Sequence, residues 1–180
     1  MKTESRIFCF FIVYNITVTN YRKLVVAIGV KIIVDADACP VKTEIADAAA
    51  RFGVPVVMVA SYDHRLEARD GVTVVQVDRS DQSVDLYIAN RIAAGDILIT
   101  QDFGLATIGL AKKAIALSNR GQTYTDRTID FLLENRHERA KQRRGGKYGK
   151  GPKPFAEADR QSFLQCLTKV LTHLQENGAN

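Results

Sequence analysis

The chain alternates between short apolar runs and longer stretches in which apolar residues recur at helical spacing. A compact apolar run predicts a buried strand, whereas recurrence every three or four positions predicts a helix. The predicted strands are 31–34, 55–60, 72–77, 97–100 and 114–117, and the predicted helices are 44–53, 83–94, 103–113, 129–139 and 156–175. This alternation indicates a mainly parallel sheet with helices on both faces, so the expected fold class is α/β, a three-layer α/β/α arrangement.

Proline and glycine mark the ends of several predicted elements. Pro40 suits the first turn of a helix, and Gly53 and Gly95 are typical of helix ends. The stretch RRGGKYGKGPKP is rich in Gly and Lys and offers little to pack, so residues 136–154 are expected to form a flexible basic loop. A length of 180 residues is typical of one domain.

Acidic residues gather where predicted strands end. Asp35 and Asp37 come directly after the first strand, Asp102 follows the fourth, and Asp85 lies in the first turn of a helix. Open parallel sheets bind ligands beyond the carboxyl ends of their strands, so these side chains are expected to lie close together. Clustered carboxylates repel one another unless a cation neutralises them, and their oxygens suit hard cations. The sequence therefore predicts a Mg²⁺ or Mn²⁺ site at these four aspartates.

Each acid also has an ordinary structural interpretation. An Asp after a strand is commonly a helix cap or a turn former. Glu44, in the first predicted helix, is a further candidate ligand, although a Glu in a first turn also favours the helix dipole. Asp81 could cap the following helix, and Asp96, at the amino end of a strand, is expected to be a turn residue.

Basic residues are concentrated in one segment. Between Arg136 and Lys153 eight Lys or Arg residues accompany one acid, a net charge of +7, so the rest of the chain carries −2 of the total +5. Such a segment favours phosphate-rich polymers, and an aromatic ring within it can stack on a base; the alternative is a solvated loop that serves solubility. The residues expected to contact nucleic acid are Arg143, Arg144, Lys147, Tyr148, Lys150, Lys153 and Lys42, with Arg79 as a further candidate.

The cysteines and apolar runs bear on location. Three cysteines without a pairing pattern indicate free thiols in a reducing compartment, here expected to be the cytoplasm. Cys39 stands where a helix begins and could be a nucleophile, but no His is placed as its base, so a buried structural thiol is the favoured interpretation. Three scattered His residues also argue against a zinc site. No apolar run reaches the roughly 18 residues that span a membrane, and residues 7–14 lack a signal-peptide cleavage pattern.

Three motifs carry a family resemblance. VDADACPVKTEI, DQSVDLYIANRIAAGDILITQDFGLA and RRGGKYGKGPKPF, in this order, resemble the bacterial YaiI/YqxD family of uncharacterised proteins over about residues 31–172. That family looks related to PIN-like domains, in which one Asp follows the first strand, another opens a later helix, and the next strand ends in T-x-D. Asp35, Asp85 and Thr100-Gln101-Asp102 match this pattern, and Glu44 is the counterpart of a Glu usual in an early helix.

The resemblance implies a single PIN-like domain over residues 31–176 with the activity of a metal-dependent nuclease, and RNA as the substrate ahead of DNA. Residues 1–30 lie outside the family pattern and are interpreted as an N-terminal extension, with initiation near Val26 or Val30 as a hypothesis. In this interpretation Asp35, Asp85 and Asp102 bind the metal directly, and Asp37 is a ligand or the general base.

Two other functions stay open at this point. A D-x-D after an apolar strand is also typical of haloacid-dehalogenase-like phosphatases, with Asp35 as nucleophile and Asp37 as acid, although the later G-D-x-x-x-D of such enzymes is missing. The third alternative is an inactive module that binds RNA or a protein partner. The sequence predicts neither the oligomeric state nor the identity of the metal.

Overall fold

The computed structural model describes residues 29–63, 69–78, 83–146, 151 and 153–178. The interpretation of residues 1–30 as an extension therefore falls almost entirely outside the described residues, as do Arg79, Asp81, Lys147, Tyr148 and Lys150.

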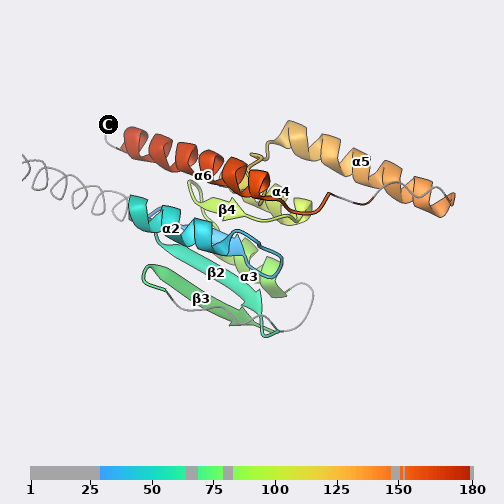
Figure 1. Ribbon diagram of the computed structural model, residues 1–180. Helices are drawn as coiled ribbons and strands as arrows, with labels where there is room; N and C mark the ends of the chain where they lie inside the picture. The colour runs from blue at the N-terminus through green and yellow to red at the C-terminus, as the bar shows by residue number, and fades with distance from the viewer. Residues whose placement is uncertain (1–28, 64–68, 79–82, 147–150, 152, 179–180) are drawn as a thin grey trace, which may run out of the picture.

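A five-stranded, fully parallel sheet forms the centre of the molecule (Figure 1). Its strands stand in the order β3-β2-β1-β4-β5. They comprise β1 (Ile32–Asp35), β2 (Val56–Ser61), β3 (Val72–Val77), β4 (Ile97–Ile99) and β5 (Ile115–Leu117). All five strands are those predicted, displaced by no more than one residue at either end.

Helices cover both faces of the sheet. They are α2 (Lys42–Phe52), α3 (Ser83–Arg91), α4 (Phe103–Ala111), α5 (Asp126–Arg144) and α6 (Glu157–Gly178). Helices α2 and α6 lie side by side on one face, and α3, α4 and α5 pack on the other (Figure 1). The predicted three-layer α/β/α fold is confirmed. In the described part of the chain, no helix combines the length and hydrophobicity that a membrane crossing requires.

Two hydrophobic cores hold the layers together, and β1 contributes to both. Side chains of a strand alternate between its faces, so Ile32 and Val34 pack with α2 and α6 while Ile33 packs with α3 and α4. The side chains of all three residues are fully buried, which fits a central strand. The end of β1 is therefore held rigidly, and so is the aspartate that closes it.

Helix boundaries follow the predicted signals with two clear exceptions. Helix α3 ends at Arg91, so the predicted end at residue 94, marked by Gly95, is wrong. Gly53 ends α2 in the left-handed conformation at φ 68°, as predicted. The prediction of a flexible loop over residues 136–154 is wrong for residues 136–144, which continue α5 as far as Arg144. Arg, Glu, Ala, Lys and Gln are good helix formers and basic side chains suit a helix C-terminus, so the helix extends until Gly145 without needing an apolar face.

A capping box fixes the start of α5. The Thr125 hydroxyl accepts a hydrogen bond from the Thr128 backbone, and the Thr128 side chain accepts one from the Thr125 backbone.

We expect Thr125→Ala to lower the free energy of unfolding by about 1 kcal/mol, the usual cost of a lost cap. Urea denaturation measures the change, with exposed Thr172→Ala in α6 as the control. A Thr125→Ala variant as stable as this control would contradict the assigned role.

Asp96 is confirmed as a turn residue at the amino end of β4. Its buried carboxylate accepts hydrogen bonds from the Lys31 amine at 2.6 Å, the Lys31 backbone at 3.1 Å and the Ala93 backbone at 2.8 Å. Buried charge is tolerated where it is paired and hydrogen-bonded in this way. Asp96 thus fastens β4 to the start of β1, at the opposite edge of the sheet from the other predicted acids.

Candidate metal and nucleic-acid site

The topology reverses between β1 and β4, which are neighbours in the sheet. The chain leaves β1 towards α2 on one face and leaves β4 towards α4 on the other. At such a switch point the two connections diverge and leave a crevice beyond the carboxyl ends of the strands, where open α/β sheets bind ligands. Asp35 ends β1 and Asp102 stands between β4 and α4, so both lie at this crevice.

Thr100 connects these two aspartates. Its buried hydroxyl donates a hydrogen bond to Asp35 Oδ2 at 2.9 Å and accepts one from the Asp102 backbone N–H at 3.0 Å. Asp102 Oδ1 accepts a hydrogen bond from the Leu105 backbone at 2.9 Å, which confirms the ordinary capping interpretation for that oxygen. A Cβ on Gly104 would stand 2.9 Å from the same oxygen, so the glycine keeps room for this carboxylate.

Asp37 and Asp85 approach the crevice from neighbouring elements. Asp37 Oδ1 accepts a hydrogen bond from the Ser61 backbone at 2.8 Å, which joins the loop after β1 to the end of β2. Asp85 is half-buried in the first turn of α3, and its pKa is raised by burial and then by the negative charges of Asp102 and Asp35. The four predicted aspartates are thus in one electrostatic neighbourhood.

Asp35 has a raised pKa, to which its acidic neighbours contribute after burial. Burial raises its pKa above 3.8, the hydrogen bond from Thr100 acts in the opposite direction, and the charges of Asp37 and Asp102 raise it further. A bound cation would remove this repulsion by neutralising the carboxylates.

Tyr124 lies beside the same group. Its hydroxyl donates to the Thr100 carbonyl oxygen at 3.5 Å, and its ring meets the edge of Phe103 with centroids 6.0 Å apart. Burial, and then the charge of Asp102, raise the pKa of Tyr124 to about 12. The phenol is therefore protonated at neutral pH and helps to hold the end of β4. Sequence reasoning did not single it out, since nothing in its spacing relates it to the acids.

The described acidic side chains do not form a closed metal cage. Among residues 29–63, 69–78, 83–146, 151 and 153–178, no group of three His, Cys, Asp or Glu side chains is arranged to hold a metal ion. Mg²⁺ usually keeps several waters and binds proteins through only one or two carboxylates. Asp35, Asp85 and Asp102 supply oxygen donors of the type it prefers, and ligation by any of them remains a prediction.

Glu44 has a structural partner. Its Oε1 accepts a hydrogen bond from the Arg160 guanidinium at 2.6 Å, and the same nitrogen donates to the Pro40 carbonyl at 2.7 Å. Glu44 Oε2 is buried without a hydrogen-bond partner. Glu44 therefore joins the start of α2 to α6, and its role as a metal ligand stays a prediction.

Cys39 is buried beside the site, as the structural interpretation predicts. Burial, opposed by the backbone of Val41 and by Lys42, raises the pKa of its thiol to about 11. Little thiolate exists at pH 8, so we expect alkylation of Cys39 to be at least about tenfold slower than that of half-buried Cys166. Peptide-resolved mass spectrometry after timed treatment with iodoacetamide measures both rates. Equal rates, or faster labelling of Cys39, would restore the nucleophile interpretation.

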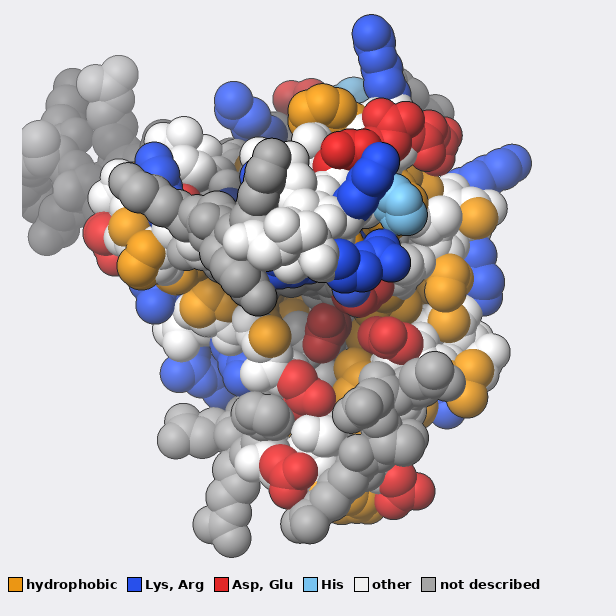
Figure 2. Space-filling view, turned by 90° about the vertical axis from the view of Figure 1, so that its right-hand side faces the viewer, with side chains coloured by type: hydrophobic (Ala, Val, Ile, Leu, Met, Phe, Trp, Pro, Cys, Tyr) orange, Lys and Arg blue, Asp and Glu red, His pale blue; other side chains and the backbone are white. Residues whose placement is uncertain are grey.

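Helix α5 extends past the carboxyl edge of the sheet (Figure 1). It is 19 residues long, or roughly 28 Å at about 1.5 Å per residue. Ile129 is the buried residue through which α5 contacts the hydrophobic core. Further along the helix, on the side that carries Ile129, helical spacing places Arg136, Arg139 and Arg143. These exposed side chains form the basic face of α5. In Figure 2, which views this edge, acidic side chains occupy the middle of the surface with basic side chains directly above them.

The other predicted nucleic-acid residues are distributed around this edge. Arg143 and Arg144 are exposed in the last turn of α5, and half-buried Lys42 begins α2. Lys153 is exposed, and its backbone carbonyl accepts a hydrogen bond from Arg120 at 2.7 Å. Arg136 was not among the predicted contacts, nor was Arg139. The helical spacing of these residues with Arg143 would have indicated both, if the predicted helix had continued as far as Gly145.

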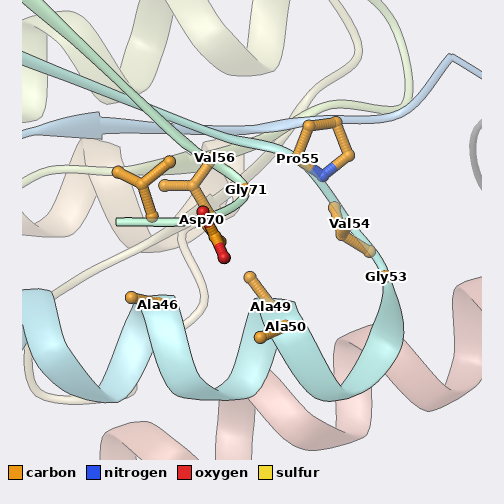
Figure 3. Close-up of a pocket in the computed structure, with 10 residues that line it drawn as sticks. Ala46, Ala49, Ala50, Gly53, Val54, Pro55, Val56, Asp70 and Gly71 are labelled. Atoms are coloured by element: carbon orange, nitrogen blue, oxygen red, sulfur yellow. The ribbon is translucent and has the colours of Figure 1, made fainter. Parts of the chain in front are cut away.

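A second hollow lies at the opposite, amino edge of the sheet (Figure 3). It has a volume of about 420 Å³ and is lined by small and apolar side chains of α2, by the turn that leads into β2, and by residues before β3. Asp70 is the only charged residue among the described residues that line it. This hollow is thus separate from the four aspartates, and its described lining lacks the grouped charges of a phosphate site.

Comparison with known proteins identifies relatives over most of the chain. The model of the uncharacterized YaiI/YqxD family matches residues 33–173. A UPF0178 protein from Bacillus pumilus is 50% identical over 143 residues, which cover 79% of this chain and 86% of the relative. A UPF0178 protein from Listeria monocytogenes is 44% identical over 141 residues, which cover 78% of this chain and 97% of the relative.

A further UPF0178 protein, from Halalkalibacterium halodurans, is 43% identical over 143 residues, covering 79% of this chain and 91% of the relative. No solved structure matches the chain significantly. The family model spans more than half of the sequence and the relatives align along most of their own length, which confirms the predicted resemblance: the chain belongs to the YaiI/YqxD family.

Proposed function

We propose that this protein is a metal-dependent nuclease that cleaves RNA in the cytoplasm. The observation that carries the proposal is the acidic crevice at the β1–β4 switch point, on the edge of the sheet past which the basic helix α5 extends. A phosphodiester hydrolase needs both features, because carboxylates hold the metal while cations hold the nucleic-acid backbone. The resemblance of Asp35, Asp85 and the T-x-D motif to the PIN-like pattern points to the same chemistry.

The side chains have distinct roles in this proposal. Asp35, Asp85 and Asp102 would bind Mg²⁺ or Mn²⁺, which when bound lowers the pKa of a water and stabilises charge on the phosphodiester. Thr100 holds Asp35 in place through its hydroxyl, and Gly104 keeps Asp102 accessible. Asp37 is fixed by the Ser61 backbone at the rim, where it would accept a proton or a hydrogen bond from water.

The proposal is tested with the full chain, end-labelled single-stranded RNA and Mn²⁺, with p-nitrophenyl phosphate as a small ester for comparison. We expect cleavage of the RNA that EDTA abolishes and no comparable turnover of the ester. Turnover of the ester without RNA cleavage would replace the nuclease with the phosphatase alternative. Retention of RNA without any cleavage would leave an inactive binding module.

A further inference from the structure

A shallow hollow lies at the carboxyl ends of β2 and β3, on one side of α3. Its volume is about 390 Å³, near the lower end of the roughly 300–1,000 Å³ common for small-ligand sites. The lining combines two aromatic rings with amide, carboxylate and aliphatic side chains. These include Tyr62, Gln76, Asp78, Leu86, Tyr87 and Asn90.

The end of β2 and helix α3 each have residues at both the hollow and the acidic crevice. Tyr62 directly follows Ser61, whose backbone N–H binds Asp37, and its own N–H donates to the Val77 carbonyl at 3.2 Å. Helix α3 carries lining residues on one side and Asp85 near the opposite side, as the helical period requires. The crevice and the hollow are therefore separated by about the width of one helix, roughly 10 Å.

The chemistry of the lining suits an aromatic, uncharged ring. The Tyr62 side chain is 54% exposed, which leaves a ring surface available for stacking. The guanidinium of Arg91 lies 4.7 Å from the centroid of the Tyr87 ring, so Tyr87 already has a stacking partner. The described residues that line the hollow include no Lys or Arg but do include Asp78, which disfavours a phosphate there.

We propose that this hollow binds an unpaired nucleobase of the strand whose backbone lies in the acidic crevice. The base stacks on Tyr62, and the side chains of Gln76, Asp78 and Asn90 provide donors and acceptors for its edge. Because of the separation by α3, this base belongs to a nucleotide beyond the one at the crevice. The inference rests on the proposed function and adds to it that the substrate is single-stranded, since a paired base cannot reach the hollow.

The test measures binding of a twelve-nucleotide single-stranded RNA to the full chain in EDTA by fluorescence anisotropy. Stacking on an aromatic ring strengthens single-strand binding by about tenfold or more per base, so Tyr62→Ala should weaken binding about tenfold. Tyr62→Phe keeps the ring and should bind within about twofold of the wild type. Phe131→Ala removes an aromatic ring that is 63% exposed on α5 and serves as the matched control.

A ribose-phosphate strand without bases separates stacking from charge. The wild type and Tyr62→Ala should bind this abasic strand equally, because only backbone contacts remain. If the wild type binds the intact RNA and Tyr62→Ala binds it equally well, the nucleobase site is overturned while the proposed function stands. If the wild type binds no RNA at all, both fail.

Discussion

Asp35→Asn is expected to lower the rate of Mn²⁺-dependent RNA cleavage by at least about a hundredfold, because a carboxylate that orders the metal is worth several kcal/mol at the transition state. The substitution preserves the shape of the side chain, and its amide oxygen can still accept the hydrogen bond that Thr100 donates. A lower cleavage rate in this variant would therefore reflect the lost charge and lost metal binding rather than misfolding. Initial rates at saturating Mn²⁺ measure it.

Asp47→Asn is the matched control for this prediction. Asp47 lies on the exposed side of α2, its side chain is 60% exposed, and its one described ion pair, with Arg69, spans 3.7 Å. We expect this variant to cleave like the wild type. Cleavage that survives unchanged in Asp35→Asn would show that Asp35 has no part in the reaction.

The same variant should make the metal-free protein more stable. Since the pKa of Asp35 is raised in the folded state, its charged form opposes folding at neutral pH. The substitution removes a charge that burial, and then the charges of Asp37 and Asp102, disfavour, so the free energy of unfolding should increase. The difference in free energy of unfolding between Asp35→Asn and the wild type should be largest at pH values above the raised pKa of Asp35. It should disappear as the pH falls towards 3.8, the pKa of an unperturbed Asp. Thermal denaturation in EDTA across this pH range measures it.

Removal of the basic face of α5 is the second large effect expected. The combined substitution of Arg136, Arg139 and Arg143 by Ala should weaken RNA binding roughly thirtyfold at low salt, because three phosphate contacts are lost. The slope of log K against log salt should decrease in magnitude by about 2, given about 0.7 per phosphate on a single strand. Fluorescence anisotropy between low and physiological salt measures both quantities. The helix should persist, since Ala is the best helix former.

Three basic residues that lie away from the carboxyl edge of the sheet provide the control for net charge alone. Arg51, Lys112 and Lys169 are exposed, at the ends of α2 and α4 and within α6. Their combined replacement by Ala removes the same net charge and should leave the salt dependence nearly unchanged. Equal losses in the two triple variants would mean that net charge, and not the face of α5, determines binding.

The sheet was predictable because its strands are short, apolar and bounded by strong turn signals. Ile33 and Val34 lie in a run too apolar for any position but the centre of a sheet, and Gly53 ends α2 where a left-handed residue is required. The length of α5 was not predictable from hydrophobic periodicity, because residues 136–144 form a helix with little packing. Propensity and charge at the C-terminus, rather than burial, extend that helix.

Among the acidic residues, too, some positions were predictable from the sequence and others were not. Placement at strand ends was sufficient to bring Asp35 and Asp102 to one crevice, since parallel strands share a carboxyl edge. The ion pair of Glu44 with Arg160 was not predictable, because it joins side chains 116 positions apart in the sequence. Tyr62 was missed for a related reason: its neighbours in the hollow come from β3 and α3, so only the packed sheet brings them together.

The most direct test of the central claim is the anomalous diffraction of crystals grown with Mn²⁺. We predict a peak in the crevice between Asp35, Asp85 and Asp102, with water completing the coordination. A well-ordered crevice without a peak at saturating Mn²⁺, or a peak only at other surface carboxylates, would contradict the metal site and with it the proposed nuclease.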